Sequence, residues 1–150
     1  DAGRYDVVLM DAFGSMFSVP FQLTTVEAVR KISDSLSDDG VVIFNLGSSI
    51  TGAGSGFFHA EMATYRAVFP NVYVLKVRAD RPDYSLQNLI IVATRSSQRP
   101  QLTSSDAEIA ALFANLYSEN VHLDLPILTD DLAPVEYYNS VAQNQYIPSH

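Results

Sequence analysis

The sequence predicts an α/β fold in which a mostly parallel sheet is flanked by helices. One observation is the alternation of short apolar runs, typical of strands, with segments whose apolar residues recur every three or four positions, typical of amphipathic helices. The other is the spacing of the runs. A helix-length segment separates the first two, as a parallel crossover requires, but only about ten residues separate the last two. We therefore expect the sheet to end in an antiparallel hairpin.

The first strand and helix follow from the opening residues. The run YDVVLM (5–10) is apolar on both faces, which is typical of a strand buried between two layers. Thr24 and Glu27 form a capping box that predicts a helix start, and Gly40 predicts a left-handed helix end. One apolar stripe along this segment is formed by Leu23, Val26, Val29, Ile32 and Leu36. The run VVIFNL (41–46) then predicts a second strand, parallel to the first.

The remaining elements are predicted in the same way. We expect a glycine-rich loop after the second strand, a helix at 56–69 stopped by Pro70, and strands at 71–78 and 88–95. Ser105 and Glu108 predict the cap of another helix. Its inward-facing residues should be Ile109, Leu112, Phe113 and Leu116. The tail after this helix is too rich in Pro and Asp to form a central element, and the 150 residues fit a single domain.

Composition restricts the function. Hydrophobic residues make up 47% of the chain and charged residues 17%, which indicates a globular domain. A net charge of −8 argues against a nucleic-acid partner, and fits an acidic solvated surface or a cationic substrate. No apolar run reaches the ~20 residues of a membrane helix, there is no cysteine, and the three histidines show no metal-ligand spacing. We expect a cytoplasmic protein with no bound metal.

Asp11 is the main candidate for chemistry. It ends the first strand, and ligands of open α/β sheets bind beyond the carboxyl ends of the strands. An unpaired buried carboxylate is costly, so Asp11 either faces a ligand cleft or caps the turn that follows it. Asn45 ends the second strand at the same rim, where its amide could bind substrate or satisfy loop backbone.

Three segments together resemble the spermidine synthase-like proteins, which are polyamine aminopropyltransferases. They are YDVVLMDAF followed by VPFQLTTVEA, DDGVVIFNL, and LTDDLAPVEYY in the tail. The resemblance implies the carboxyl-terminal half of the S-adenosylmethionine-dependent methyltransferase fold, without the preceding half that carries the glycine-rich cofactor loop. The start at Asp1 fits such a partial domain. On this view the 150 residues alone should be inactive and bind the cofactor weakly.

The resemblance also implies site residues. Asp11 matches the first acid of the family's Asp-x-x-Asp motif and would be the base or electrostatic anchor. Asp11, Ala12 and Phe13 would contact decarboxylated S-adenosylmethionine or S-adenosylmethionine. Tyr84 resembles the family's gate tyrosine, although its spacing to the next strand is shorter. Gly14 stands where the motif has its second acid, so recognition of a diamine in the usual manner is not expected.

Other readings remain open. The parent domain could be a methyltransferase, or a non-catalytic domain that oligomerises or senses a ligand. Asp130 and its neighbours could select a cationic substrate, or cap a helical turn that holds Pro134 and Glu136. The GAGSG segment (52–56) does not have dinucleotide-binding spacing and is read as a rim loop. Without a preceding strand, the first strand becomes an apolar edge, which predicts a homodimer.

Overall fold

A computed structural model of the chain describes residues 4–11, 20–119, 121, 123 and 125–144. Four strands form one sheet in the order β1 (Tyr5–Met10), β2 (Leu36–Ser48), β4 (Gln87–Thr94) and β3 (Asn71–Lys76). β1 and β2 are parallel, and β4 runs antiparallel to both of its neighbours. The predicted parallel crossover and the closing antiparallel hairpin are both present.

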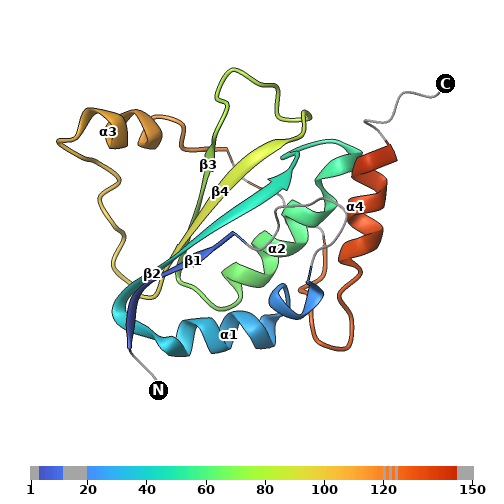
Figure 1. The fold of residues 1–150 in the computed structure, drawn as a ribbon, viewed down its shortest axis with the longest axis horizontal. Coiled ribbons are helices and arrows are strands. Elements are labelled where there is room, and N and C mark those ends of the chain that lie inside the picture. Colours follow the sequence, from blue (N-terminus) through green and yellow to red (C-terminus); the bar gives the residue numbers. More distant parts are fainter. Residues whose placement is uncertain (1–3, 12–19, 120, 122, 124, 145–150) are drawn as a thin grey trace.

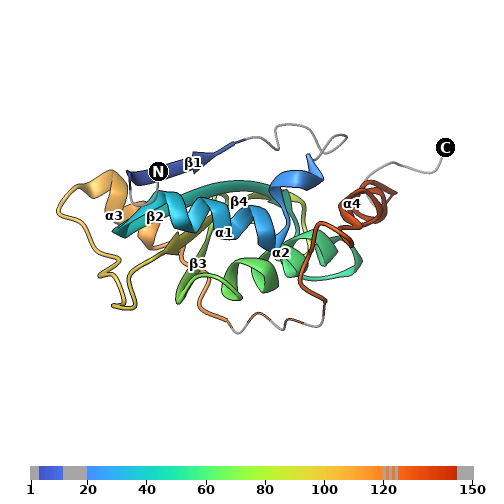
Figure 2. The same cartoon turned by 90° about the horizontal axis from the view of Figure 1, so that it is seen from below.

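Three helices lie on one side of this sheet. They are α1 (Val26–Ser35), α2 (Gly56–Arg66) and α4 (Val135–Asn144) (Figures 1 and 2). α3 (Ala107–Phe113) stands apart from them (Figure 1). Two short 3₁₀ turns, Phe21–Leu23 and Ala53–Ser55, lead into α1 and α2.

The core lies between α2 and the covered face of the sheet. Along β2 and β4 every second side chain is fully buried on this face, as the period of two in a strand requires. These side chains are Val42, Phe44, Leu46, Leu89, Ile91 and Ala93. The ring of Phe44 stacks on Tyr65 of α2 with centroids 5.5 Å apart. The intervening residues point to the opposite face, which carries none of these three helices.

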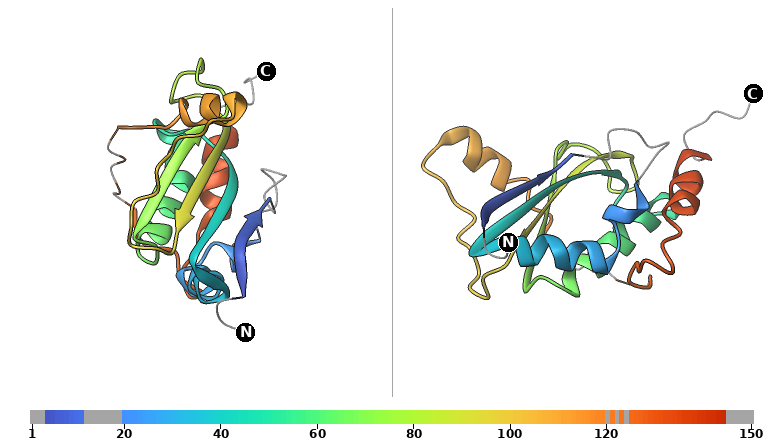
Figure 3. Two further views of the ribbon diagram at one scale, coloured as in Figure 1. Left: turned by 90° about the vertical axis from the view of Figure 1, so that its left-hand side faces the viewer. Right: turned by 60° about the horizontal axis from the view of Figure 1, so that its bottom comes forward.

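The two outer edges of the sheet differ. Along β3, the segment 115–117 covers the edge: Lys76 N–H donates to Asn115 O at 3.1 Å, and Tyr117 N–H donates to Val74 O at 2.8 Å. β1 pairs only with β2 among the described strands and lies along the other edge (Figure 3). Leu9 is 73% exposed. The expectation of a first strand buried between two layers is therefore wrong for this chain, and the expectation of an apolar edge is confirmed.

Several local predictions need correction at the first helix. Its cap is Thr25, whose hydroxyl accepts from Ala28 N–H at 3.3 Å, and not Thr24. The helix ends at Ser35 because Leu36 already pairs with Tyr5 of β1. Gly40 consequently lies inside β2, and it does not have the positive φ of a left-handed cap.

The third helix also differs from its prediction. Its cap is Asp106, which accepts from two backbone N–H groups, and not Ser105. The helix has no buried residue, and Ile109 and Leu112 are 44% and 58% exposed. Its apolar face was expected to point inward, but the helix stands away from the core that would have covered it.

Candidate active site at the carboxyl rim of the sheet

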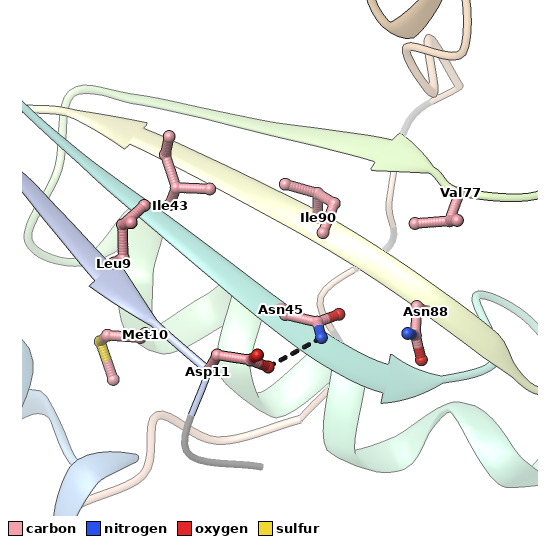
Figure 4. Close-up of a pocket in the computed structure, with 8 residues that line it drawn as sticks. All are labelled: Leu9, Met10, Asp11, Ile43, Asn45, Val77, Asn88 and Ile90. Carbon is pink, nitrogen blue, oxygen red and sulfur yellow. Dashed lines mark hydrogen bonds between the residues drawn. The ribbon is translucent and has the colours of Figure 1, made fainter. Parts of the chain in front are cut away.

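The structure places Asp11 and Asn45 side by side. Met10 of β1 pairs with Phe44 of β2, so the next residues, Asp11 and Asn45, are neighbours. The expectation that Asn45 ends its strand is wrong, because β2 continues to Ser48 by pairing with β4. The Asn45 side-chain amide donates to Asp11 Oδ1 at 2.9 Å (Figure 4). Neither of the two roles considered for Asn45 includes this contact. The hydrogen bond from Asn45 holds one oxygen of the Asp11 carboxylate. The other carboxylate oxygen does not take part in this bond.

Asp11 and Asn45 line a hollow of about 310 Å³. The hollow lies on the face of the sheet opposite α2, across β1, β2 and β4 (Figure 4). Its lining residues are Leu9, Met10, Asp11, Ile43, Asn45, Val77, Asn88 and Ile90. One end is therefore polar and carries a carboxylate, while the rest is mainly aliphatic. Binding sites for small molecules commonly combine an apolar lining with a few polar groups.

Asn88 belongs to the polar end although no sequence pattern singled it out. β4 runs antiparallel to β2, so its first residues lie at the rim where β2 ends, and Asn88 pairs with Gly47. The oxygen of the Asn45 amide is turned toward Asn88, away from Asp11 (Figure 4). That oxygen is buried and has no hydrogen-bond partner among the described residues. A buried acceptor without a donor costs about 1–3 kcal/mol.

Tyr84 does not line this hollow. Its side chain is 67% exposed, on the loop between β3 and β4. The same loop is fastened to the segment after β2, because Asp83 O accepts from the N–H groups of Ile50 and Thr51 at 2.8 and 3.1 Å. Lys76 also forms an ion pair with the Asp83 carboxylate at 2.7 Å. Tyr84 therefore stands on an anchored loop beside the Ile50–Thr51 segment.

Asp130 lies at the start of α1. Its carboxylate accepts from the Thr25 hydroxyl at 2.6 Å, and its N–H donates to Glu27 Oε2 at 3.1 Å. Asp130 also lines a second hollow of about 370 Å³ with residues of the α4 start, and it does not line the hollow of Asp11. The contacts tie the tail to α1. Ala12, Phe13 and Gly14 lie outside the described residues.

A buried acid in α2 was not predicted. Glu61 is fully buried, and neither carboxylate oxygen has a hydrogen-bond partner among the described residues. Burial raises the pKa of Glu61 well above its ordinary value. Burial, and then the charge of Glu61, raise the pKa of Tyr65, whose hydroxyl donates to Met10 Sδ at 3.3 Å. Glu61 is three residues after Phe58 and four before Tyr65, so the helical period places it beside the apolar face of α2.

Metal and membrane features are not found in the described part of the chain. No group of three His, Asp or Glu side chains there could hold a metal ion. His59 instead contacts Ile50 O through Nε2 at 2.9 Å. No helix among the described residues is long and apolar enough to span a bilayer.

Comparison with known proteins relates this geometry to one family. The chain is 32% identical over 108 residues to a polyamine aminopropyltransferase of Vibrio vulnificus (strain CMCP6), covering 72% of this chain and 33% of that protein. It is 26% identical over 165 aligned positions to a probable polyamine aminopropyl transferase of Bifidobacterium longum (strain NCC 2705), covering 96% and 36%. The resemblance to the spermidine synthase-like family is confirmed.

The spermidine synthase-like fold is also confirmed. The crystal structure of a probable spermidine synthase from Corynebacterium glutamicum ATCC 13032 superposes with a TM-score of 0.58 and 22% identity, covering 94% of this chain and 47% of that one. The chain thus spans about a third of the length of the two sequence relatives and under half of the solved structure. No protein-family model matches the chain.

Proposed function

We propose that these 150 residues form the acceptor-binding part of a spermidine synthase-like transferase, which moves an aminopropyl group from decarboxylated S-adenosylmethionine to an amine. The observation that carries the proposal is the Asp11 carboxylate, held by Asn45 in a hollow at the carboxyl rim. The likeness to polyamine aminopropyltransferases supports it. The protein would act in polyamine biosynthesis in the cytoplasm.

The charge of the hollow suits this donor and this acceptor. The described lining includes one carboxylate and no Lys or Arg. A sulfonium donor and an ammonium acceptor are both cationic, so an acidic site attracts each of them. Asp11, with the neighbouring Ala12 and Phe13, would hold the donor beside the acceptor. Bound decarboxylated S-adenosylmethionine supplies a propyl carbon made electrophilic by the adjacent sulfonium.

Asp11 would act on the acceptor amine. In the proposed reaction the amine nitrogen forms a bond to the propyl carbon, the bond from that carbon to sulfur breaks, and the sulfur leaves as a neutral thioether. The carboxylate orients the amine and takes the proton that the nitrogen loses. Asn45 would keep one carboxylate oxygen fixed, so that the other faces the amine. Tyr84 and Asp130 would bind substrate only as the family resemblance implies, since neither lines the hollow.

A second candidate is a domain without catalysis that keeps the fold for oligomerisation or ligand sensing. The sequence favours it in one respect, because Gly14 occupies the place of the second motif acid. A methyltransferase on the same scaffold would also place its acceptor near Asp11. These candidates differ in whether transfer occurs and in which group is transferred.

The test is a transfer assay on the longest available form of the protein that contains these residues, with both cofactor forms. We expect aminopropyl transfer, and a loss of about 10²–10⁴-fold in kcat/KM for Asp11→Asn, the range for removal of a general base. Asp38→Asn, an exposed acid near the opposite end of β2, is the matched control and should retain the rate. Equal rates for the two variants would reduce Asp11 to a structural role. Absence of transfer with either cofactor would favour the non-catalytic domain, and methyl transfer would favour the methyltransferase.

A further inference from the structure

A third hollow lies at the opposite end of the sheet from Asp11. It occupies the region where α2 ends, β3 begins and the chain leaves β4 (Figure 1). These segments meet because Asn71, the first residue of β3, pairs with Thr94, the last residue of β4. The hollow has a volume of about 660 Å³, against about 310 Å³ for the hollow at the rim. Small-molecule sites commonly have volumes of about 300–1,000 Å³.

Two arginines line this hollow from different parts of the chain. Arg66 is in the last turn of α2, and Arg99 follows the end of β4. Neither guanidinium has an ion pair or a hydrogen bond in the described part of the chain. A cation in the last turn of a helix is favoured by the helix dipole, which accounts for Arg66 but not for Arg99. The fold therefore brings two uncompensated positive charges to one hollow.

The backbone around the hollow is held by hydrogen bonds. The Asn71 side-chain amide donates to Ser96 O at 2.9 Å and to Gln98 O at 3.1 Å, which fastens the loop that carries Arg99 to the start of β3. On the other side, Tyr117 N–H donates to the backbone of β3 at 2.8 Å. A site whose backbone is ordered before binding loses less conformational entropy when a ligand enters.

We propose that this hollow binds a small organic phosphate, and that Arg66 and Arg99 contact the phosphate group. A guanidinium suits a phosphate because it stays charged and donates in a planar, bidentate geometry. Tyr73 and Tyr117 line the same hollow and offer aromatic surface to the organic part of the ligand. Glu119 lines it as well, but its carboxylate accepts from the Tyr117 hydroxyl at 3.3 Å. Two cations against one acid in the described lining favour an anionic ligand.

The experiment titrates phenyl phosphate into the 150-residue protein at low salt, where exposed charges are least screened. The backbone amide signals of Arg66 and Arg99 are followed by NMR, and the Asn45 side-chain amide reports on the rim. We expect saturable perturbation of both arginines and none of Asn45, because the rim hollow carries the Asp11 carboxylate. Phenol and inorganic phosphate each lack one half of the probe, and both should bind more weakly.

Arg66→Gln and Arg99→Gln test the contact with the phosphate. Both positions are exposed, so the substitutions leave the core unchanged. Loss of one exposed charge pair should weaken the affinity for phenyl phosphate by about two- to fivefold in each variant. Arg30→Gln is the matched control, because it removes the same charge from an exposed position on α1 that does not line the hollow, and it should leave the affinity unchanged.

Three results would overturn the proposal. They are no saturable perturbation of the two arginines, binding of phenol as tight as that of phenyl phosphate, and an equal loss of affinity in all three variants. Binding of inorganic phosphate as tight as that of phenyl phosphate would refute the organic part of the ligand. None of these measurements involves turnover, so a failure here leaves the proposed transfer untouched, and a failure of transfer leaves this proposal untouched.

Discussion

The two faces of the sheet are built from alternate residues of the same strands, but they differ in what they do. On the covered face, Phe44 and Leu46 are fully buried beneath α2. On the other face, Ile43 and Asn45 line an open hollow. One residue along the strand separates a side chain that stabilises the fold from one available to a ligand. Substitutions at neighbouring positions should therefore have very different consequences.

The largest difference should appear between Phe44 and Ile43. Phe44→Ala removes a fully buried ring that stacks on Tyr65, and we expect a loss of about 3–5 kcal/mol in the free energy of unfolding. Ile43→Ala, at a half-buried position on the other face, should cost about 1 kcal/mol. Urea denaturation measures both. Similar losses would mean that the second face is also packed in solution.

On the covered side, substitution of Glu61 should stabilise the protein, whereas substitution of Phe44 destabilises it. Its pKa is raised in the folded state, so between the ordinary value of 4.5 and that raised pKa the unfolded chain releases a proton that the folded chain keeps. The free energy of unfolding should therefore fall as the pH rises through this interval. Glu61→Met removes the carboxyl group at similar length, and should stabilise the protein at pH 7 by about 1–3 kcal/mol.

The comparison needs denaturation curves over a range of pH. Glu61→Met should lose the fall in stability above pH 4.5, and Glu61→Gln, which cannot ionise but remains polar, should lose it as well. If both variants retain the pH dependence of the unmodified protein, another group is responsible for it.

The smallest change in stability should follow substitution on the uncovered side. Leu9→Lys alters a side chain that is 73% exposed, and should change the free energy of unfolding by no more than about 0.5 kcal/mol. It should nevertheless weaken the predicted homodimer, because it places a charge on the apolar edge strand β1. Sedimentation velocity measures this. Leu112→Lys on α3, also at an exposed leucine, is the control and should leave association unchanged. A monomer at all concentrations before substitution would contradict the dimer.

The sequence was sufficient for the relative directions of the strands, because apolar runs and the lengths between them restrict the topology. The place of β4 between β2 and β3 was not predicted. The sequence was less reliable at element ends. Gly40 follows two aspartates and has the pattern of a helix cap, but pairing of Leu36 with Tyr5 starts β2 earlier. A pairing partner distant in the chain decided this boundary, and local sequence does not reveal it.

The candidate site, too, was only partly predictable from the sequence. Asp11 and Asn45 were expected together because each was predicted to end a parallel strand, but Asn45 lies inside β2. Their hydrogen bond depends on the register of β1 against β2, which only the structure gives. Asn88 was missed although the antiparallel hairpin was predicted. Because β4 runs antiparallel to β2, the first residues of β4 lie beside the last residues of β2. The predicted hairpin was therefore enough to place Asn88 near Asn45. The spacing of Glu61 from Phe58 and Tyr65 also placed it near the apolar face of α2, but its complete burial depends on what packs around the helix.

The anchored loop of Tyr84 has a consequence for access to the rim. Asp83 accepts hydrogen bonds from Ile50 and Thr51, and the neighbouring Gly52 has φ of 81°, which a residue with a side chain rarely adopts. A displacement of the loop backbone at Asp83 must break those bonds or move the turn that follows β2 along with it. The backbone on either side of these two hydrogen bonds is therefore coupled, and one turn holds the other in place.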